Sequence, residues 1–225
     1  MRRSGYPVTI AAEYGVRARL DGLLAAEKVR GVVLSAGPQW RTYGLPREEA
    51  SGVRARWRTE LQRLRTQGEL LDTRDAVVEY GVRGELRARG WDHDEWPEAP
   101  EEAWDTGRWP GSRDGGYPER VSARLDGELV RRTVAACWAT SCEAIAALRR
   151  WRDAHPGITP SRYRLGEGGR EELVGPLAEY ERLSARVTTT GEIWRAGLAR
   201  GVTRLEGLAR ASADSAAGQQ GDTTG

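Results

Sequence analysis

Hydrophobic and polar residues alternate strictly over residues 120–125, as the period of two in a half-buried strand requires. The spacing of apolar residues then changes to three and four, which predicts helices. Asp126 stands where a helix N-cap belongs, and Thr140 with Glu143 has the capping-box spacing that begins a second helix. A strand followed by two helices is therefore expected over residues 119–155. The polar positions of this strand are Arg120, Ser122 and Arg124.

The N-terminal block, residues 1–90, has a mixed pattern that predicts an α/β domain of unknown role. Apolar residues recur at spacings of three and four over residues 47–71, and a further helix is expected over residues 73–90. A compact apolar run bounded by glycines, residues 29–37, is typical of a short buried strand.

Residues 91–118 form an acidic segment rich in proline and tryptophan, which predicts a linker or an irregular loop. Its tryptophans are costly to expose to water, so we expect some of them to dock on a neighbouring domain or on a partner. They are Trp91, Trp96, Trp104 and Trp109.

The block 156–210 is helical in its pattern, with a second capping box at Thr189 and Glu192. Small and long apolar residues follow at spacings of three and four, which favours a helix packed on another helix, either within the chain or across a dimer. The small, polar tail 211–225 is expected to be disordered. The whole chain is predicted to be mainly α-helical with a few short strands, in the α+β class.

An echo links two distant parts of the chain. The segment "GYPVTIAAEYGVRARLDG", residues 5–22, shares "GYP" and "ARLDG" with "GYPERVSARLDG", residues 116–127. Either this is a coincidence in a chain rich in arginine, glycine and alanine, which we favour, or it marks a duplicated strand element.

The 225 residues carry a net charge of +2, so no overall basic field points to nucleic acid. Nearly all the positive charge is arginine, which a GC-rich genome also produces. Cys137 and Cys142 are too few for a disulfide framework. No signal peptide or membrane span is evident, so we expect a cytoplasmic protein that does not contact a membrane.

Candidate chemistry is sparse. There is no glycine-rich phosphate loop, no nucleophile elbow and no paired set of metal ligands. Asp92, His93 and Asp94 suggest metal ligands only weakly, because their spacing matches no common site. We therefore expect neither an enzyme nor a cofactor or metal.

The strand and the two helices of residues 119–155 cannot close a core alone, and the strand has no partner within the unit. Two copies that pair their strands and interlock their helices would solve both problems. In this the segment resembles the ribbon-helix-helix family of DNA-binding proteins, which includes bacterial antitoxins and repressors of the MetJ, Arc and CopG type.

The resemblance implies that Arg120, Ser122 and Arg124 enter the major groove of double-stranded DNA and contact bases. It also implies a phosphate-binding site where the second helix begins. The residues implied there are Thr140 and Ser141, with further phosphate contacts from Arg131 and Arg132.

The function expected on this basis is sequence-specific transcriptional regulation by a homodimer, as a repressor or an antitoxin, with a protein partner bound through residues 1–118. Two other structural interpretations stay open: a helix-turn-helix variant, and one amphipathic helix over residues 127–153 beside a solvated strand face. A second ribbon-helix-helix unit over residues 161–205 is a further possibility, and a helical hairpin is favoured there. The functional alternative is a protein-interaction module that docks through the tryptophan-rich linker and the C-terminal helices.

Overall fold

A computed structural model describes residues 5–92, 95–104, 109, 116–158, 160 and 171–221. Within this part the chain is mainly helical, with one two-stranded antiparallel sheet. The predicted α+β class is confirmed at this level. None of the helices in the described part of the chain has both the length and the apolar character that a membrane span needs.

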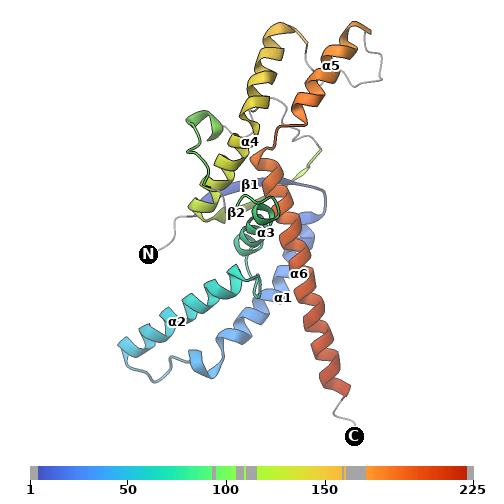
Figure 1. Cartoon of the computed structure of the whole chain (residues 1–225). Coiled ribbons are helices and arrows are strands. Elements are labelled where there is room, and N and C mark those ends of the chain that lie inside the picture. The colour runs from blue at the N-terminus through green and yellow to red at the C-terminus, as the bar shows by residue number, and fades with distance from the viewer. Residues whose placement is uncertain are drawn as a thin grey trace.

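The elements follow one another in two similar series, each with a strand first and helices after it (Figure 1). The first series is β1 (Tyr6–Ala12), α1 (Val16–Ser35), the 3-10 turn η1 (Pro38–Trp40), α2 (Arg47–Thr66) and α3 (Arg74–Ala88). The short turn η2 (Glu101–Trp104) lies between the two series. The second is β2 (Glu119–Leu125), α4 (Gly127–Ala154), α5 (Glu171–Ser184) and α6 (Thr190–Gly221).

The two strands pair with each other, so the two echoed segments meet in space. The pairing is antiparallel and Thr9 lies opposite Ser122 at its centre. Alternate residues of both strands are buried in the core, as the strand period requires. The buried residues are Val8, Ile10 and Ala12 of β1 and Val121, Ala123 and Leu125 of β2.

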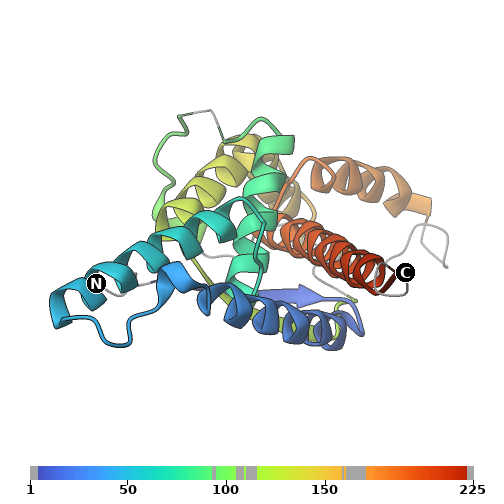
Figure 2. The ribbon, with the colours of Figure 1, turned by 90° about the horizontal axis from the view of Figure 1, so that it is seen from below.

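Helices α3 and α6 cross on the inner side of this strand pair, which we call the ribbon. Figure 2 shows both helices on the same side of the ribbon. Their crossing is very close, because a Cβ atom on Gly81 would overlap the carbonyl oxygen of Gly197. Glu85 of α3 also accepts a hydrogen bond of 3.0 Å from Arg200 of α6. The core thus includes the close crossing of one helix from each series, together with buried residues of α1 and α4.

The buried positions of the two series correspond at constant separations. Each buried residue of β1 has a buried counterpart 113 positions later in β2, for example Val8 and Val121. Each of four buried residues of α3 has one 116 positions later in α6. These pairs are Val77 and Ile193, Val78 and Trp194, Val82 and Leu198, and Leu86 and Val202. The chain therefore contains an internal structural repeat with an approximate two-fold axis.

The other helices form two arms that extend from this centre in different directions (Figure 1). One arm holds α1 and α2 and is joined at its tip by η1, where Trp40 and Trp57 pack with ring centroids 5.2 Å apart. The other arm holds α4 and α5, tied by a hydrogen bond of 3.0 Å from the Trp151 indole to the Pro176 carbonyl.

Several predicted elements are confirmed. The strand over 120–125 is β2, and the helices expected over 47–71 and 73–90 are α2 and α3. The Asp126 side chain caps α4 by accepting hydrogen bonds from the backbone amides of Glu128 and Leu129. The capping box at the start of α6 is also present, since the Thr189 and Glu192 side chains each accept the other residue's amide hydrogen.

The buried strand expected over residues 29–37 is wrong. These residues belong to the end of α1 and to the turn after it. The helix buries Leu20 and Leu24 near its start, and the later valines fall on its exposed side. A compact apolar run of this length is compatible with a buried strand and with part of a helix, so the run alone does not distinguish the two.

The helix boundary expected at Thr140 is also wrong, because α4 runs without a break from Gly127 to Ala154. Thr140 does not cap: its hydroxyl donates to the Ala136 carbonyl one turn earlier, over 2.8 Å. Such a bond is the usual way for a threonine to be accommodated inside a helix. The interpretation of 127–153 as one amphipathic helix is the one that the structure supports.

The expected pairing of this strand with a second copy is replaced by pairing within the chain, since β1 pairs along one edge of β2. One sheet and one core are consequently shared by the blocks 1–90, 119–155 and 156–210. The tail from Ala211 continues α6 as far as Gly221. The strand suggested within residues 161–166 lies outside the described residues.

Tryptophans of the linker dock within the chain, as expected. Trp109 is buried and packs on Trp138 of α4, with ring centroids 5.7 Å apart. Trp104 packs on Tyr6 of β1 at 6.0 Å. The linker therefore covers part of the junction between the ribbon and α4.

Candidate nucleic-acid interface

The ribbon has an outward face formed by the residues that alternate with its buried ones. Five of these six residues are exposed, and Ala11 is partly exposed. The strand register places them in three opposite pairs, which are Pro7 with Arg124, Thr9 with Ser122, and Ala11 with Arg120. The three residues expected to contact bases thus lie together on one exposed surface.

Arg124 combines a fixed backbone with an unengaged side chain. Its amide donates a hydrogen bond of 2.8 Å to Oδ1 of Asp75, in the first turn of α3. Within the described part of the chain, no hydrogen bond or ion pair engages its guanidinium. No described residue therefore competes with a ligand for the five N–H donors of this side chain.

Arg120 is held near the start of β2. One terminal nitrogen of its guanidinium, Nη1, donates to the carbonyl oxygens of Tyr117 at 2.7 Å and Glu119 at 3.0 Å. These bonds orient the side chain and leave the donors on Nε and Nη2 for other contacts. Arg120 is exposed, so a ligand can reach it.

The side chain of Glu119, which precedes Arg120 in the sequence, is directed toward the start of α1 and not toward Arg120. The Glu119 side chain accepts hydrogen bonds of 2.8 Å from the amides of Gly15 and Arg17, at the start of α1. These two backbone hydrogen bonds lower the pKa of Glu119 below its ordinary value. Glu119 therefore replaces the missing side-chain cap of α1, whose N-cap residue is glycine. No local spacing indicates this role, because Glu119 and Gly15 are 104 positions apart in the sequence.

The predicted phosphate-binding residues are not arranged as expected. Thr140 and Ser141 lie in the middle of α4, where no helix N-terminus offers free amides. Ser141 is buried, and its hydroxyl oxygen accepts a hydrogen bond of 2.9 Å from the amide of Thr188. It joins α4 to the segment before α6.

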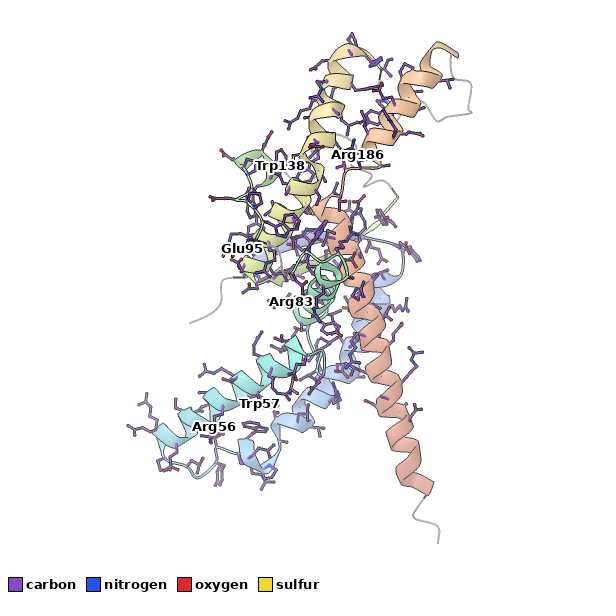
Figure 3. The ribbon with its side chains drawn as sticks, in the orientation of Figure 1. Arg56, Trp57, Arg83, Glu95, Trp138 and Arg186 are labelled. Atoms are coloured by element: carbon purple, nitrogen blue, oxygen red, sulfur yellow. The ribbon has the colours of Figure 1, made fainter. Side chains whose placement is uncertain are left out.

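Arg131 and Arg132 are engaged on the surface of α4. Arg131 forms an ion pair of 2.8 Å with Glu128, and Arg132 donates a hydrogen bond of 3.1 Å to the Asp92 carbonyl. Both line a cavity of about 460 Å³ beside the linker residues Glu95 and Trp96. Figure 3 shows Glu95 close to α4.

Two further helices, α3 and α6, also begin beside the ribbon. Thr73 caps α3 by accepting a hydrogen bond of 3.1 Å from the Ala76 amide. The first residues of α6 line a cavity of about 200 Å³ together with Thr9 of β1. The sequence indicated where both helices begin but not that they flank the ribbon, because this depends on the crossing of α3 and α6.

Other chemistry is not assembled in the described residues. No three side chains of histidine, cysteine, aspartate or glutamate gather there as metal ligands. His93 and Asp94 lie outside the described residues. Cys137 is fully buried, which raises the pKa of its thiol far above the ordinary value and suits a packing role.

Comparison of the sequence with protein-family models and with curated proteins, and of the fold with solved structures, found no match. The interpretation of this chain therefore depends on the geometry of the ribbon itself.

Proposed function

We propose that this protein binds double-stranded DNA in a sequence-specific manner through the outward face of the ribbon and acts as a transcriptional regulator. The observation that carries the proposal is the pairing of β1 with β2, which presents Arg120, Ser122 and Arg124 on one exposed surface.

The dimensions of such a ribbon suit the major groove of B-DNA, which is about 12 Å wide and admits two paired strands. An arginine can donate two hydrogen bonds to O6 and N7 of guanine, and a hydroxyl can contact several bases. These groups are supplied by the guanidinium of Arg124, which no described residue engages, and by the exposed hydroxyls of Thr9 and Ser122.

The core behind the ribbon supports the resemblance to the ribbon-helix-helix family in an altered form. Each strand is followed by a helix, and a later helix of each series crosses its counterpart on the inner side. In our proposal one chain supplies both ribbon-helix-helix units, and α1–α2 and α4–α5 are extended arms inserted between the helices of each unit. A repressor or antitoxin-like role is the simplest consequence of occupying a site beside a promoter.

Fluorescence anisotropy of the full chain with labelled genomic DNA fragments, at two salt concentrations, tests the proposal. We expect preference for particular fragments and weaker binding at the higher salt concentration, as phosphate contacts require. Arg124→Ala should lower the affinity for the preferred fragment about 10- to 100-fold, the usual effect of losing a bidentate guanine contact.

Arg56→Ala is the matched control, because it removes the same charge from the exposed surface of α2, on the α1–α2 arm (Figure 3). It should leave the affinity nearly unchanged. Equal losses in both variants, or no binding by the folded protein at low salt, would refute the proposal.

One observation favours a second candidate, a protein-interaction module. Val29, Val32 and Val33 of α1 are 65%, 67% and 66% exposed. Apolar residues of a helix usually pack against a neighbouring element, and a group of them exposed together is typical of a protein-interaction site. If protein interaction is the function, Val32→Glu should reduce association measured by sedimentation velocity, and Arg124→Ala should have no effect in any assay. If DNA binding is the function, Arg124→Ala should reduce the affinity for DNA and Val32→Glu should leave that affinity unchanged.

A further inference from the structure

We propose, on the premise that the ribbon binds DNA, that it recognises a sequence without two-fold symmetry and that both guanine contacts come from β2. This inference concerns the kind of DNA site and follows from the way in which the internal repeat departs from symmetry.

The approximate two-fold axis of the ribbon passes between Thr9 and Ser122. These residues are opposite each other in the antiparallel register. They are also counterparts in the repeat, since they lie 113 positions apart, as the buried residues of the two strands do. A residue paired with its own repeat counterpart marks the axis of an antiparallel ribbon. Two identical strands arranged in this way would read a palindrome.

The chemistry on the two sides of this axis differs. The counterpart of Arg120 is Pro7, and the counterpart of Arg124 is Ala11. Proline has no side-chain donor, and the alanine methyl group can make only apolar contacts, such as one with the methyl group of thymine. Bidentate recognition of guanine is therefore available from two side chains of β2 and from none on the outward face of β1, where the hydroxyl of Thr9 can make only single hydrogen bonds to bases.

The spacing of the two arginines sets the spacing of the guanines. Arg120 and Arg124 are four residues apart on the same face of β2. At about 3.3 Å per residue their Cα atoms are about 13 Å apart, which corresponds to about four base-pair steps of B-DNA. Arg120 lies near the start of β2 and Arg124 near its end. Each half-site therefore meets an arginine from a different position of the same strand, so the two half-sites cannot be equivalent.

The helix N-termini that flank the ribbon are also attached to it differently. α3 has Asp75 in its first turn, where the carboxylate accepts the amide hydrogen of Arg124 in β2. The residue 116 positions later in α6 is Gly191, which has no side chain that could make such a bond to β1. The acidic residue in the first turn of α6 is Glu192, and its carboxylate accepts the amide hydrogen of Thr189. The departure from symmetry therefore extends to the way in which the two helices hold the strands.

Selection from a random double-stranded DNA library with the full chain, followed by sequencing, tests the inference. We expect a non-palindromic motif with two guanine positions about four base pairs apart, bound by one chain per site as measured by the mass of the complex. A palindromic motif, or two chains on each short site, would overturn the inference and leave DNA binding itself established.

Repeating the selection with single variants separates the contributions of the two arginines. Arg120→Ala should abolish the preference at one guanine position only, and Arg124→Ala at the other. Arg124→Lys retains the charge but not the paired donors, so it should relax the preference at its position with a smaller loss of affinity. Loss of preference at two symmetry-related positions from one substitution would contradict the inference. Absence of any enriched motif with the unaltered chain would overturn both the inference and the proposed function.

Discussion

Gly81 of α3 and Gly197 of α6 bring the backbones of their helices into direct contact, since a Cβ atom on Gly81 would overlap the Gly197 carbonyl oxygen. The contact is reciprocal, because a Cβ atom on Gly197 would lie 2.9 Å from the amide nitrogen of Val82. The two glycines are counterparts in the internal repeat. The crossing therefore lies on or near the approximate two-fold axis and determines how closely the two series pack.

Gly81→Ala should destabilise the protein by about 3 kcal/mol, at the upper end of what overpacking a core costs, because neither backbone can yield easily. Urea denaturation followed by circular dichroism measures this change. Gly207→Ala is the control within α6, where an added Cβ has nothing within 4 Å. That substitution should stabilise the protein by about 0.5–1 kcal/mol through helix propensity. Equal effects of the two substitutions would show that the helices do not cross at these glycines.

A second prediction concerns Ser141, whose buried hydroxyl accepts the Thr188 amide hydrogen. Ser141→Ala leaves this amide without its partner and should cost about 1–3 kcal/mol of unfolding free energy. The neighbouring Thr140→Ala removes only hydrogen bonds to the carbonyls of Ala136 and Cys137 in the preceding turn and should change the stability little. If thermal unfolding of the two variants is indistinguishable, Ser141 does not join α4 to the start of α6 as described.

The difference between these neighbours also shows what the sequence could and could not reveal. Thr140 with Glu143 and Thr189 with Glu192 have the same spacing, yet only the second pair caps a helix. Local spacing cannot show that Ser141 bonds to a residue 47 positions away. The alternation in β2 was readable because it depends on the strand period alone. Its partner β1 was not predicted, because strand pairing is a long-range contact and the echo matches the end of β2 with residues of α1.

Glu85 gives a prediction about pH. Burial raises its pKa, but hydrogen bonds from Arg89 and Arg200 outweigh this effect and hold the pKa below its ordinary value of 4.5. The charged form is thus favoured by folding. Its contribution to stability is complete above pH 4.5 and disappears as the pH falls through the lowered pKa.

Glu85→Gln should therefore reduce the unfolding free energy by about 1–2 kcal/mol at pH 7, and the difference from the unaltered protein should vanish in acid. Glu143→Gln is the control, because the side chain of Glu143 is 89% exposed and lies 3.7 Å from Arg186. It should have little effect at any pH. If the loss of unfolding free energy in Glu85→Gln persisted unchanged in acid, the stabilising role of the charged form of Glu85 would be contradicted.

Pairing of β1 with β2 inside one chain predicts that the ribbon forms without association of chains. The midpoint of thermal unfolding should then be the same over a hundredfold range of protein concentration, as calorimetry or circular dichroism can show. A ribbon built from two copies would instead become more stable as the concentration rises, because association favours the folded state by mass action.

The central claim is that the outward face of the ribbon contacts guanine in the major groove, and protection of guanine N7 from methylation by dimethyl sulfate tests it most directly. On a preferred fragment we expect two protected guanines about four base pairs apart, the distance set by the strand rise. One of them should regain its reactivity with Arg120→Ala and the other with Arg124→Ala. Tight binding that leaves guanine N7 fully reactive, or protection that survives both substitutions, would contradict the claim.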